Sequence, residues 1–273
     1  MTVGNASSLE GQTWHYGLVA RWWANKVAEP AELAFYRDAI RQFGEPALDL
    51  ACGTGRILVP LLAQGLDVDG VDLSDDMLEW CRQRAATEGV ETQLWAQGMR
   101  ELALPRRYRT IFICDSFGIG GSRADDRGTL RRAFEHLEPG GALVMHLGYP
   151  YDDEDEWPLW LPHHRDALPN DWPATGGRQT LADDGELEQR ARLVDLDPRE
   201  QRIVLGISAR HWRGETLAAE EQREIAISLY FEQELRLMLE LAGFDRIEVQ
   251  AGYSGRPATV DDADITYIAT RAS

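Results

Sequence analysis

The 273-residue sequence predicts an α/β protein with a doubly wound, mostly parallel seven-stranded sheet, an N-terminal helical cap and an inserted antiparallel β-meander. Three observations predict this fold class. A short apolar run at 47–51 leads into a glycine turn, a helical repeat and a second strand that ends at Asp72. Strand and helix patterns then alternate as far as residue 147, as in parallel sheets covered by helices. The stretch 186–230 instead alternates polar and apolar residues, which is typical of antiparallel strands with one covered face.

Composition limits the partners and the compartment. A net charge of −18 and a pI near 4.7 argue against a nucleic acid or an anionic membrane, since both need clustered cations, and favour a small-molecule substrate. Cys52, Cys81 and Cys114 share no metal-ligand spacing, so we expect no metal site, and an odd set of thiols is typical of a reducing cytoplasm. Nothing at the N-terminus resembles a signal peptide, and no apolar run approaches about 18 residues. We therefore expect a cytoplasmic protein.

Two short helices are expected ahead of the first strand. Aromatic residues are concentrated from Trp14 onward. Apolar residues then recur at three- and four-residue steps between Pro30 and Phe43, and Gly44 closes this amphipathic pattern. Together the two segments predict a helical layer that precedes the sheet.

The stretch 47–74 predicts one βαβ unit with a ligand at its turn. Gly53 and Gly55 permit a tight turn and a close approach of the backbone to a ligand, and the free amides of the following helix point toward it. Asp72 lies 17 positions after Gly55, at the tip of the second strand, where a carboxylate can accept both hydroxyls of a ribose. Leu58 stands where a dinucleotide-binding turn has its third glycine. The pattern therefore predicts a nucleoside without a pyrophosphate.

The remaining elements follow from periodicity and turn residues. Ser74 is a suitable N-cap, and Gly243 ends the last helical stripe. The expected helices after the glycine turn are 75–89, 130–137 and 235–242, and the later strands are 92–96, 108–114, 142–147, 247–249 and 265–270.

The residues from Asp49 to Arg56, together with Val71 to Ser74, closely resemble motif I and its acidic follower in the class I S-adenosylmethionine-dependent methyltransferases. The run Leu-Glu-Pro-Gly-Gly-Ala-Leu-Val at 137–144 extends this resemblance. The resemblance implies S-adenosylmethionine as cofactor and methyl transfer to nitrogen or oxygen of a small molecule. It also implies these contacts: Gly53 and Gly55 along the methionine and ribose, Asp49 at the amino group, Asp72 at the ribose hydroxyls and Leu73 against adenine.

The loop after the third strand departs from the family. The family usually has an aspartate there that bonds the adenine amino group, and the best alignment places Gly98 at that position. Gln97 can supply a side-chain acceptor instead, and the backbone of Gly98 and Met99 can frame the ring. Met99 is equally consistent with a core residue.

The carboxyl ends of the fourth and fifth strands are expected beside the transferred methyl group. Asp115 can contact the cofactor and orient a nucleophile or hold a cationic amine, and its alternative role is to cap the next turn. Phe117 can form an aromatic wall against the sulfonium or pack in the core. His146 can take the proton that a methylated group loses, and its alternative is a hydrogen-bonded core histidine.

Aromatic residues outside the core of the resemblance are the expected acceptor contacts. The resemblance implies that the leading helices carry a tyrosine near the reactive methyl group, and Tyr16 is our choice, with Trp22 and Trp23 beside it. Their alternative role is to cover the sheet edge. Tyr149 and Trp157 belong to a loop rich in aromatic residues that we interpret as an ordered lid over the pocket.

We expect a single methyltransferase domain over 1–273, because this length suits one large domain with an insertion. Its expected parts are the N-terminal helical cap at 13–45, the cofactor-binding core at 46–148, the inserted loop and antiparallel sheet over the substrate at 149–230, and the last helix with the terminal hairpin at 231–273. Such inserted sheets roof the substrate site or pair subunits in some small-molecule methyltransferases, so a homodimer is an open expectation.

Two other functions stay open at this point. Gly98, in place of the usual acid, leaves a non-catalytic S-adenosylmethionine-binding regulatory protein on the same scaffold as an alternative. A nicotinamide-dependent oxidoreductase is a third, which Leu58 at the third glycine position disfavours.

Overall fold

The computed structural model describes residues 12–148, 156–181 and 185–273. A seven-stranded sheet has the order β10-β11-β5-β4-β1-β2-β3, with β11 antiparallel to both of its neighbours. Its strands are β1 (Ala47–Leu50), β2 (Val68–Asp72), β3 (Leu94–Ala96), β4 (Tyr108–Cys114), β5 (Leu137–Gly148), β10 (Arg246–Ala251) and β11 (Asp264–Thr270). The predicted doubly wound sheet is confirmed. β5 begins five residues before the expected 142, because the Pro-Gly-Gly turn is part of the strand.

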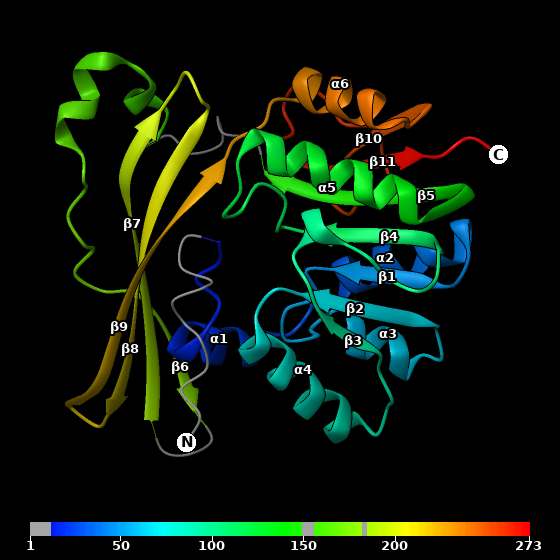
Figure 1. Cartoon of the computed structure of the whole chain (residues 1–273). Helices are drawn as coiled ribbons and strands as arrows, with labels where there is room; N and C mark the ends of the chain where they lie inside the picture. Colours follow the sequence, from blue (N-terminus) through cyan, green and yellow to red (C-terminus); the bar gives the residue numbers. More distant parts are fainter. Residues whose placement is uncertain (1–11, 149–155, 182–184) are drawn as a thin grey trace.

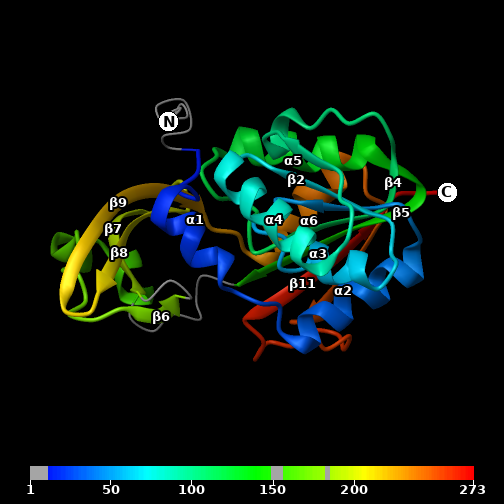
Figure 2. The ribbon, with the colours of Figure 1, turned by 90° about the horizontal axis from the view of Figure 1, so that it is seen from below.

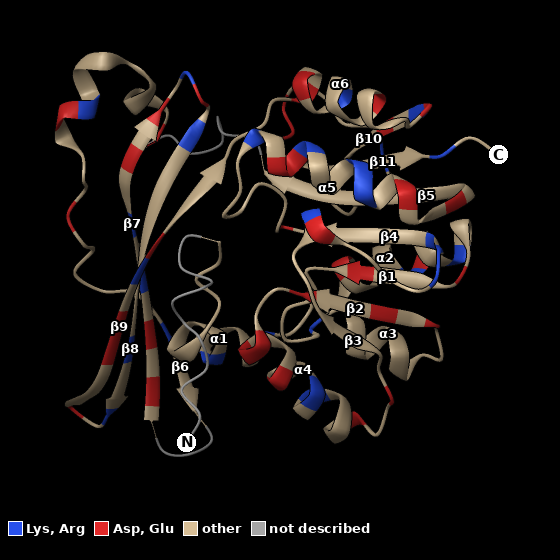
Figure 3. Cartoon of the chain, viewed as in Figure 1, with Lys and Arg blue, Asp and Glu red and all other residues tan. Residues whose placement is uncertain are grey.

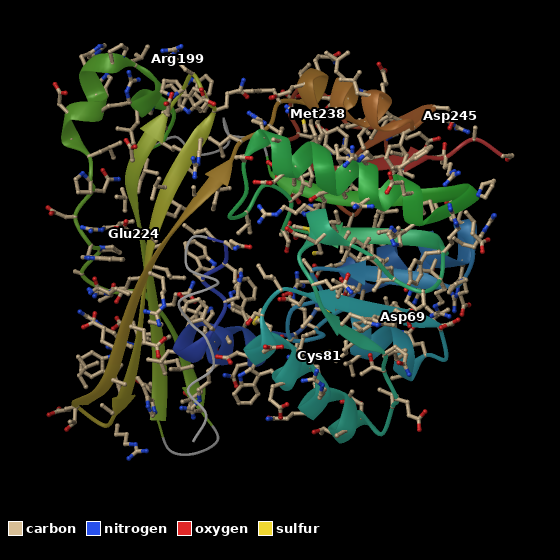
Figure 4. All side chains as sticks on the ribbon, viewed as in Figure 1. Asp69, Cys81, Arg199, Glu224, Met238 and Asp245 are labelled. Atoms are coloured by element: carbon tan, nitrogen blue, oxygen red, sulfur yellow. The ribbon has the colours of Figure 1, made fainter. Side chains whose placement is uncertain are left out.

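Helices cover both faces of this sheet (Figure 2). They are α2 (Pro30–Phe43), α3 (Leu58–Ala63), α4 (Asp75–Glu88), α5 (Arg123–His136) and α6 (Glu232–Ala242), whereas α1 (Gly17–Ala24) packs against α4 and the second sheet described below. α2, α3 and α4 pack on one face, where Cys81, labelled in Figure 4, is fully buried. α5 and α6 pack on the other, where Met238 of α6 joins the core. Burial of these apolar side chains is the main force that holds the layers together.

The register of the parallel strands brings the chemically interesting residues to one edge. Asp72 is paired with Ala96, and Cys114 with His146, so the carboxyl ends of β2, β3, β4 and β5 meet at the same side. Asp115 follows β4 directly and has a left-handed backbone with φ +53°, which turns it out of the strand direction.

A second, antiparallel sheet stands beside that edge (Figure 1). Its strands are β6 (Gly177–Leu181), β7 (Gly185–Asp197), β8 (Arg202–Arg213) and β9 (Thr216–Ser228), in sequential order. The meander of β7, β8 and β9 confirms the expectation, whereas β6 was not expected. Two apolar residues of this sheet, Ile207 and Ile225, pack against Trp14 and Val19 from the N-terminal segment and α1.

Several hydrogen bonds tie the two sheets together. The backbone amide of Gly17, at the start of α1, donates to Asp76 at 2.7 Å, and that of Leu18 donates to Glu221 of β9 at 3.1 Å. Gly120 donates its backbone amide to Ala226 at 2.8 Å. Gly120 has φ +70°, and a Cβ there would overlap the carbonyl oxygen of Gln12, so this close approach needs glycine.

The loop that we expected as a lid lies elsewhere. Its described part contains the short 3₁₀ turns Trp157–Trp160 and Pro162–Ala167. Figure 1 shows this green segment on the side of the antiparallel sheet that faces away from the parallel sheet. There Trp172 stacks under Arg192 at 4.6 Å, so the loop covers the outer face of the meander. Within the described residues, no helix is both long and apolar enough to cross a bilayer.

Candidate functional site

A cavity of about 240 Å³ lies between the carboxyl edge of the parallel sheet and the antiparallel sheet. It brings together nine of the residues predicted from the sequence, contributed by five separate segments: Trp23, Asp49, Gly53, Asp72, Leu73, Gln97, Gly98, Met99 and Asp115. The antiparallel sheet supplies Gln189 and Ile207 to the opposite wall. The switch in strand order between β1 and β4 is where ligands bind in open α/β sheets.

Asp72 is held in place by backbone amides. One carboxylate oxygen accepts from the amide of Gly53 at 2.8 Å, and the other accepts from that of Ser74 at 2.8 Å. Burial raises the pKa of Asp72 to about 6, although both amides oppose this shift. Asp72 lines the cavity, and a carboxylate oxygen can accept more than one hydrogen bond, which suits two neighbouring hydroxyl groups.

Asp49 is a buried acid that lines the cavity. Its residue is 2% exposed, and its carboxyl group makes no hydrogen bond within the described part of the chain. Burial raises the pKa of Asp49 to about 8, with Arg56 opposing the shift and Asp72 adding to it. A buried acid without a partner is costly unless a ligand supplies a cation. Asp49 is therefore suited to bind an ammonium group.

Asp115 and His146 form a hydrogen-bonded pair at the end of β4 and β5. His146 Nδ1 bonds to the Asp115 carboxylate, and Nε2 lies 2.8 Å from the carboxylate of Asp264 in an ion-pair contact without hydrogen-bond alignment. Tyr253 stacks on the imidazole with centroids 4.3 Å apart. Asp115 lines the cavity, whereas His146 lies behind it and is 5% exposed.

Each member of the pair favours the charged form of the other. Burial would lower the pKa of His146, but the hydrogen bond and charge of Asp115, with Asp264 and Glu32, raise it above its usual value. Burial would raise the pKa of Asp115, but His146 outweighs this and lowers it. Asp115 thus presents to the cavity a carboxyl group whose charged form is favoured by the histidine behind it.

The loop after β3 supplies a carboxylate that the sequence analysis missed. The amide of Gln97 is engaged elsewhere, because its oxygen accepts from the backbone of Ala103 at 2.9 Å. A Cβ at Gly98 would overlap Oε2 of Glu101 and lie 3.9 Å from a methyl carbon of Leu73. Glu101, which lines the cavity, therefore places its carboxylate where a side chain at position 98 would lie.

Comparisons with known proteins agree with this geometry. A sequence model of the methyltransferase-domain family matches residues 47–141. A putative methyltransferase from Geobacillus sp. (strain WCH70) is 30% identical over 175 residues, which cover 54% of this chain and 71% of the relative. The chain belongs to the class I S-adenosylmethionine-dependent methyltransferases.

This methyltransferase is also similar to a named relative and to a solved structure. A dTDP-3-amino-3,4,6-trideoxy-alpha-D-glucopyranose N,N-dimethyltransferase from Streptomyces venezuelae is 32% identical over 112 residues, 40% of this chain and 46% of the relative. A solved S-adenosylmethionine-dependent methyltransferase from Clostridium acetobutylicum ATCC 824 has a TM-score of 0.71 at 20% identity, over 93% of this chain and 98% of that one. The second similarity shows the shared fold. Because these comparisons are all with methyltransferases, they support neither the non-catalytic regulatory protein nor the nicotinamide-dependent oxidoreductase that the sequence left open.

The residues of the cavity fit S-adenosylmethionine. The unpartnered carboxyl group of Asp49 suits the ammonium group of the methionine part, and the lone pairs of Asp72 suit the ribose hydroxyls. Leu73 and Met99 offer apolar contacts for the adenine ring, and Glu101 offers an acceptor at its edge. When bound, the cofactor supplies an electrophilic methyl group on sulfur.

We expect cofactor affinity to rise with pH between about 6 and 8. Asp49 has a pKa of about 8 in the free protein and must lose its proton to pair with the ammonium group, so affinity should change by up to about tenfold per pH unit. Calorimetry of S-adenosylhomocysteine binding in buffers of different ionisation enthalpy measures the released proton.

The variant Asp49→Asn should bind more weakly and lose this pH dependence; an unchanged slope would contradict the assignment. The same raised pKa makes the ligand-free methyltransferase less stable as pH rises from about 4 to about 8, because the folded state keeps a proton that the unfolded chain has lost.

Exchanging the acid between positions 98 and 101 tests the adenine contact. Gly98 has φ −72°, so its backbone accepts an aspartate, and only the Glu101 side chain stands in the way. Glu101→Ala should weaken S-adenosylhomocysteine binding about tenfold, the effect of one hydrogen bond to a charged group. The double variant Gly98→Asp, Glu101→Ala should restore most of the lost S-adenosylhomocysteine affinity. Equal binding by wild type and Glu101→Ala would rule the contact out.

Several predicted site residues do not line this cavity. Gly55 faces α4 instead, where a Cβ would come within 2.6 Å of the Cys81 sulfur. Phe117 is 4% exposed in the core against Tyr230, because the turn at Asp115 directs it behind the sheet edge. These two positions thus have packing roles in the structure.

Of the predicted acceptor contacts in the leading helix, Trp23 lines the cavity, whereas Tyr16 and Trp22 do not, and Trp157 of the loop does not either. The ring of Tyr16 lies under Arg223 at 4.6 Å, and Trp22 packs on the antiparallel sheet, because α1 begins only at Gly17 and turns these side chains outward. Trp157 is 46% exposed beside Trp160. Tyr149 lies outside the described residues.

The cavity wall contains residues that sequence reasoning missed. The segment before α1 contributes Thr13, Trp14 and His15, whose backbone carbonyl accepts from the Ser74 hydroxyl. Burial lowers the pKa of His15 to about 4, so its imidazole is neutral. The aromatic run was the available signal, but the sequence does not tell which of three consecutive side chains faces inward.

Proposed function

We propose that this methyltransferase acts on an amine nitrogen of a small molecule. The proposal depends on one observation: Asp115, which is hydrogen-bonded to His146, presents a carboxylate to the cavity. A carboxylate can both hold an ammonium group and take up the proton that leaves it before attack. The similarity to a relative named as an N,N-dimethyltransferase agrees with nitrogen as the methylated atom.

Alignment and removal of water account for much of the catalysis in this proposal. Trp14, Trp23 and Ile207 make the acceptor side of the cavity apolar, which excludes water and favours a cation at an aromatic face. Two reactants held in contact gain rate from orientation alone. No nucleophilic side chain is therefore required.

The proton of the acceptor nitrogen has a path toward solvent. Asp115 takes the proton in the cavity, and its side chain is 51% exposed, so the carboxyl group can release the proton to solvent itself. His146 lies behind Asp115, so in this proposal it is a positioning residue that favours the charged form of Asp115 and takes up no proton itself. Tyr16 has no place in the path, because its ring lies against Arg223.

Paired acceptors that share a skeleton and differ only in an amine or a hydroxyl group test the proposal. With S-adenosylmethionine carrying a labelled methyl group, we expect label in the amine of each accepted pair, with the methylated nitrogen located by mass spectrometry. Label that appears only in the hydroxyl partners would contradict nitrogen as the acceptor.

A further inference from the structure

The charge of the cavity wall restricts what else the acceptor can carry. The lining contains six carboxyl groups and two guanidinium groups: Asp49, Asp72, Glu101, Asp115, Asp125 and Asp126 against Arg56 and Arg100. Figure 3 shows the acidic residues in the first turns of α4 and α5, which face the antiparallel sheet. With Asp49 and Asp72 assigned to the cofactor, four carboxyl groups still face two guanidinium groups, so an anionic group would enter a predominantly acidic space.

Both guanidinium groups are already paired. Arg56 bonds to the buried Glu32 and lies 3.7 Å from Asp115. Arg100 Nε lies 2.5 Å from Glu101, and one of its terminal nitrogens lies 3.0 Å from Asp125. A phosphate group at either arginine would have to displace a carboxylate that is in place.

Other cations near the cavity are directed elsewhere. Gln189 lines the cavity, and successive side chains of a strand alternate, so Arg190 and Arg192 extend from the opposite face of β7, where Trp172 lies beneath them. Arg223 is engaged by the ring of Tyr16. The stretches outside the description, 1–11, 149–155 and 182–184, contain no lysine or arginine in their sequence.

Two backbone amides of the loop before α5 are engaged within the chain itself. A helix N-terminus is a common anion site, and α5 begins at the cavity wall. Its end is closed by its own capping box, in which Asp125 accepts from the amide of Ser122 at 2.9 Å. The amide of Gly120 is used by the carbonyl of Ala226.

We propose that the acceptor is a phosphate-free cationic amine, and that the paired carboxylates of the wall exclude a nucleoside diphosphate sugar. A diphosphate is normally bound by free arginine or lysine side chains or by open amides. This inference rests on the proposed amine methylation. It separates this chain from the relative whose name specifies a dTDP-linked amino sugar.

Binding of dTDP alone tests the exclusion without knowledge of the acceptor. The probe is titrated calorimetrically into the methyltransferase saturated with S-adenosylhomocysteine. We expect no saturable binding, with any Kd weaker than about 1 mM, whereas a Kd below about 100 μM would overturn the proposal. An intermediate Kd also overturns it if an excess of dTDP slows methyl transfer to an amine.

Removing the partners of Arg100 should create the missing site. In Glu101→Gln, Asp125→Asn, the guanidinium group is free, and we expect dTDP affinity at least about tenfold above the wild type, with cofactor saturation verified first. The control Asp38→Asn, Glu79→Gln removes the same charge from exposed surface sites and should gain nothing. A gain in the control alone, or in neither variant, overturns the exclusion by paired carboxylates.

The two proposals fail differently. Tight dTDP binding together with amine methylation would leave the amine acceptor standing and remove the restriction on phosphate. Absence of dTDP binding together with methylation of hydroxyl groups alone would remove the amine acceptor and leave the exclusion of phosphate standing.

Discussion

Replacing Asp72 by alanine is expected to weaken binding of S-adenosylmethionine at least about 100-fold, because two charge-assisted hydrogen bonds to the ribose are lost together. The carboxylate is fixed by the amides of Gly53 and Ser74, so its geometry is set before the cofactor arrives. Calorimetry with S-adenosylmethionine and S-adenosylhomocysteine measures the effect.

Two further variants separate this loss from a general disturbance of the turn. Asp72→Asn keeps the shape and one acceptor oxygen and should bind with intermediate affinity. Asp75→Asn changes an exposed acid three residues away and should bind like the wild type. Binding by Asp72→Ala within about threefold of the wild type would remove Asp72 from the cofactor site.

The change Asp115→Asn is expected to lower kcat for an amine acceptor by about 10²–10⁴-fold, the usual contribution of a positioned acid or base. Asparagine tolerates the left-handed backbone of Asp115, so the turn should be kept. The Kd of S-adenosylhomocysteine should change little, because Asp49, Asp72 and Glu101 are untouched. Rapid-quench kinetics with the labelled cofactor measures kcat.

The pH dependence distinguishes the roles of the histidine and its outer carboxylate. His146 holds the pKa of Asp115 down, so His146→Gln should move the acid limb of kcat/KM to higher pH. Asp264→Asn should lower the pKa of His146, measured by NMR, while the exposed neighbour Asp261→Asn leaves it unchanged. A wild-type kcat in Asp115→Asn would contradict the mechanism.

The sequence was informative where local chemistry has few solutions. A tight turn with Gly53, an acid at the tip of the next strand and alternating strand and helix patterns are readable because each has a short-range signature. Asp49, Asp72 and Leu73 accordingly lie at the same cavity in the structure. The meander was readable for the same reason, since period-two alternation needs no long-range information.

Side-chain direction outside such patterns was not readable. Tyr16 and His15 are neighbours in an aromatic run, and the start of α1 decides that only His15 faces the cavity. Phe117 and His146 lie at the carboxyl ends of β4 and β5, where the sequence predicts the ligand. Both side chains nevertheless lie behind the cavity wall. Glu101 could not be preferred over Gln97, because the 3₁₀ turn over Met99–Glu101 sets its direction.

By itself the sequence determined the doubly wound sheet, the methyltransferase family, and the meeting of Gly53 and Asp72 at one turn, because these depend on spacing along the chain. Only the tertiary structure decided which residues complete the cavity, that Asp115 is hydrogen-bonded to His146, and that Arg56 and Arg100 are paired. Those properties depend on distances between segments far apart in the chain, and electrostatic energies follow from such distances and from burial.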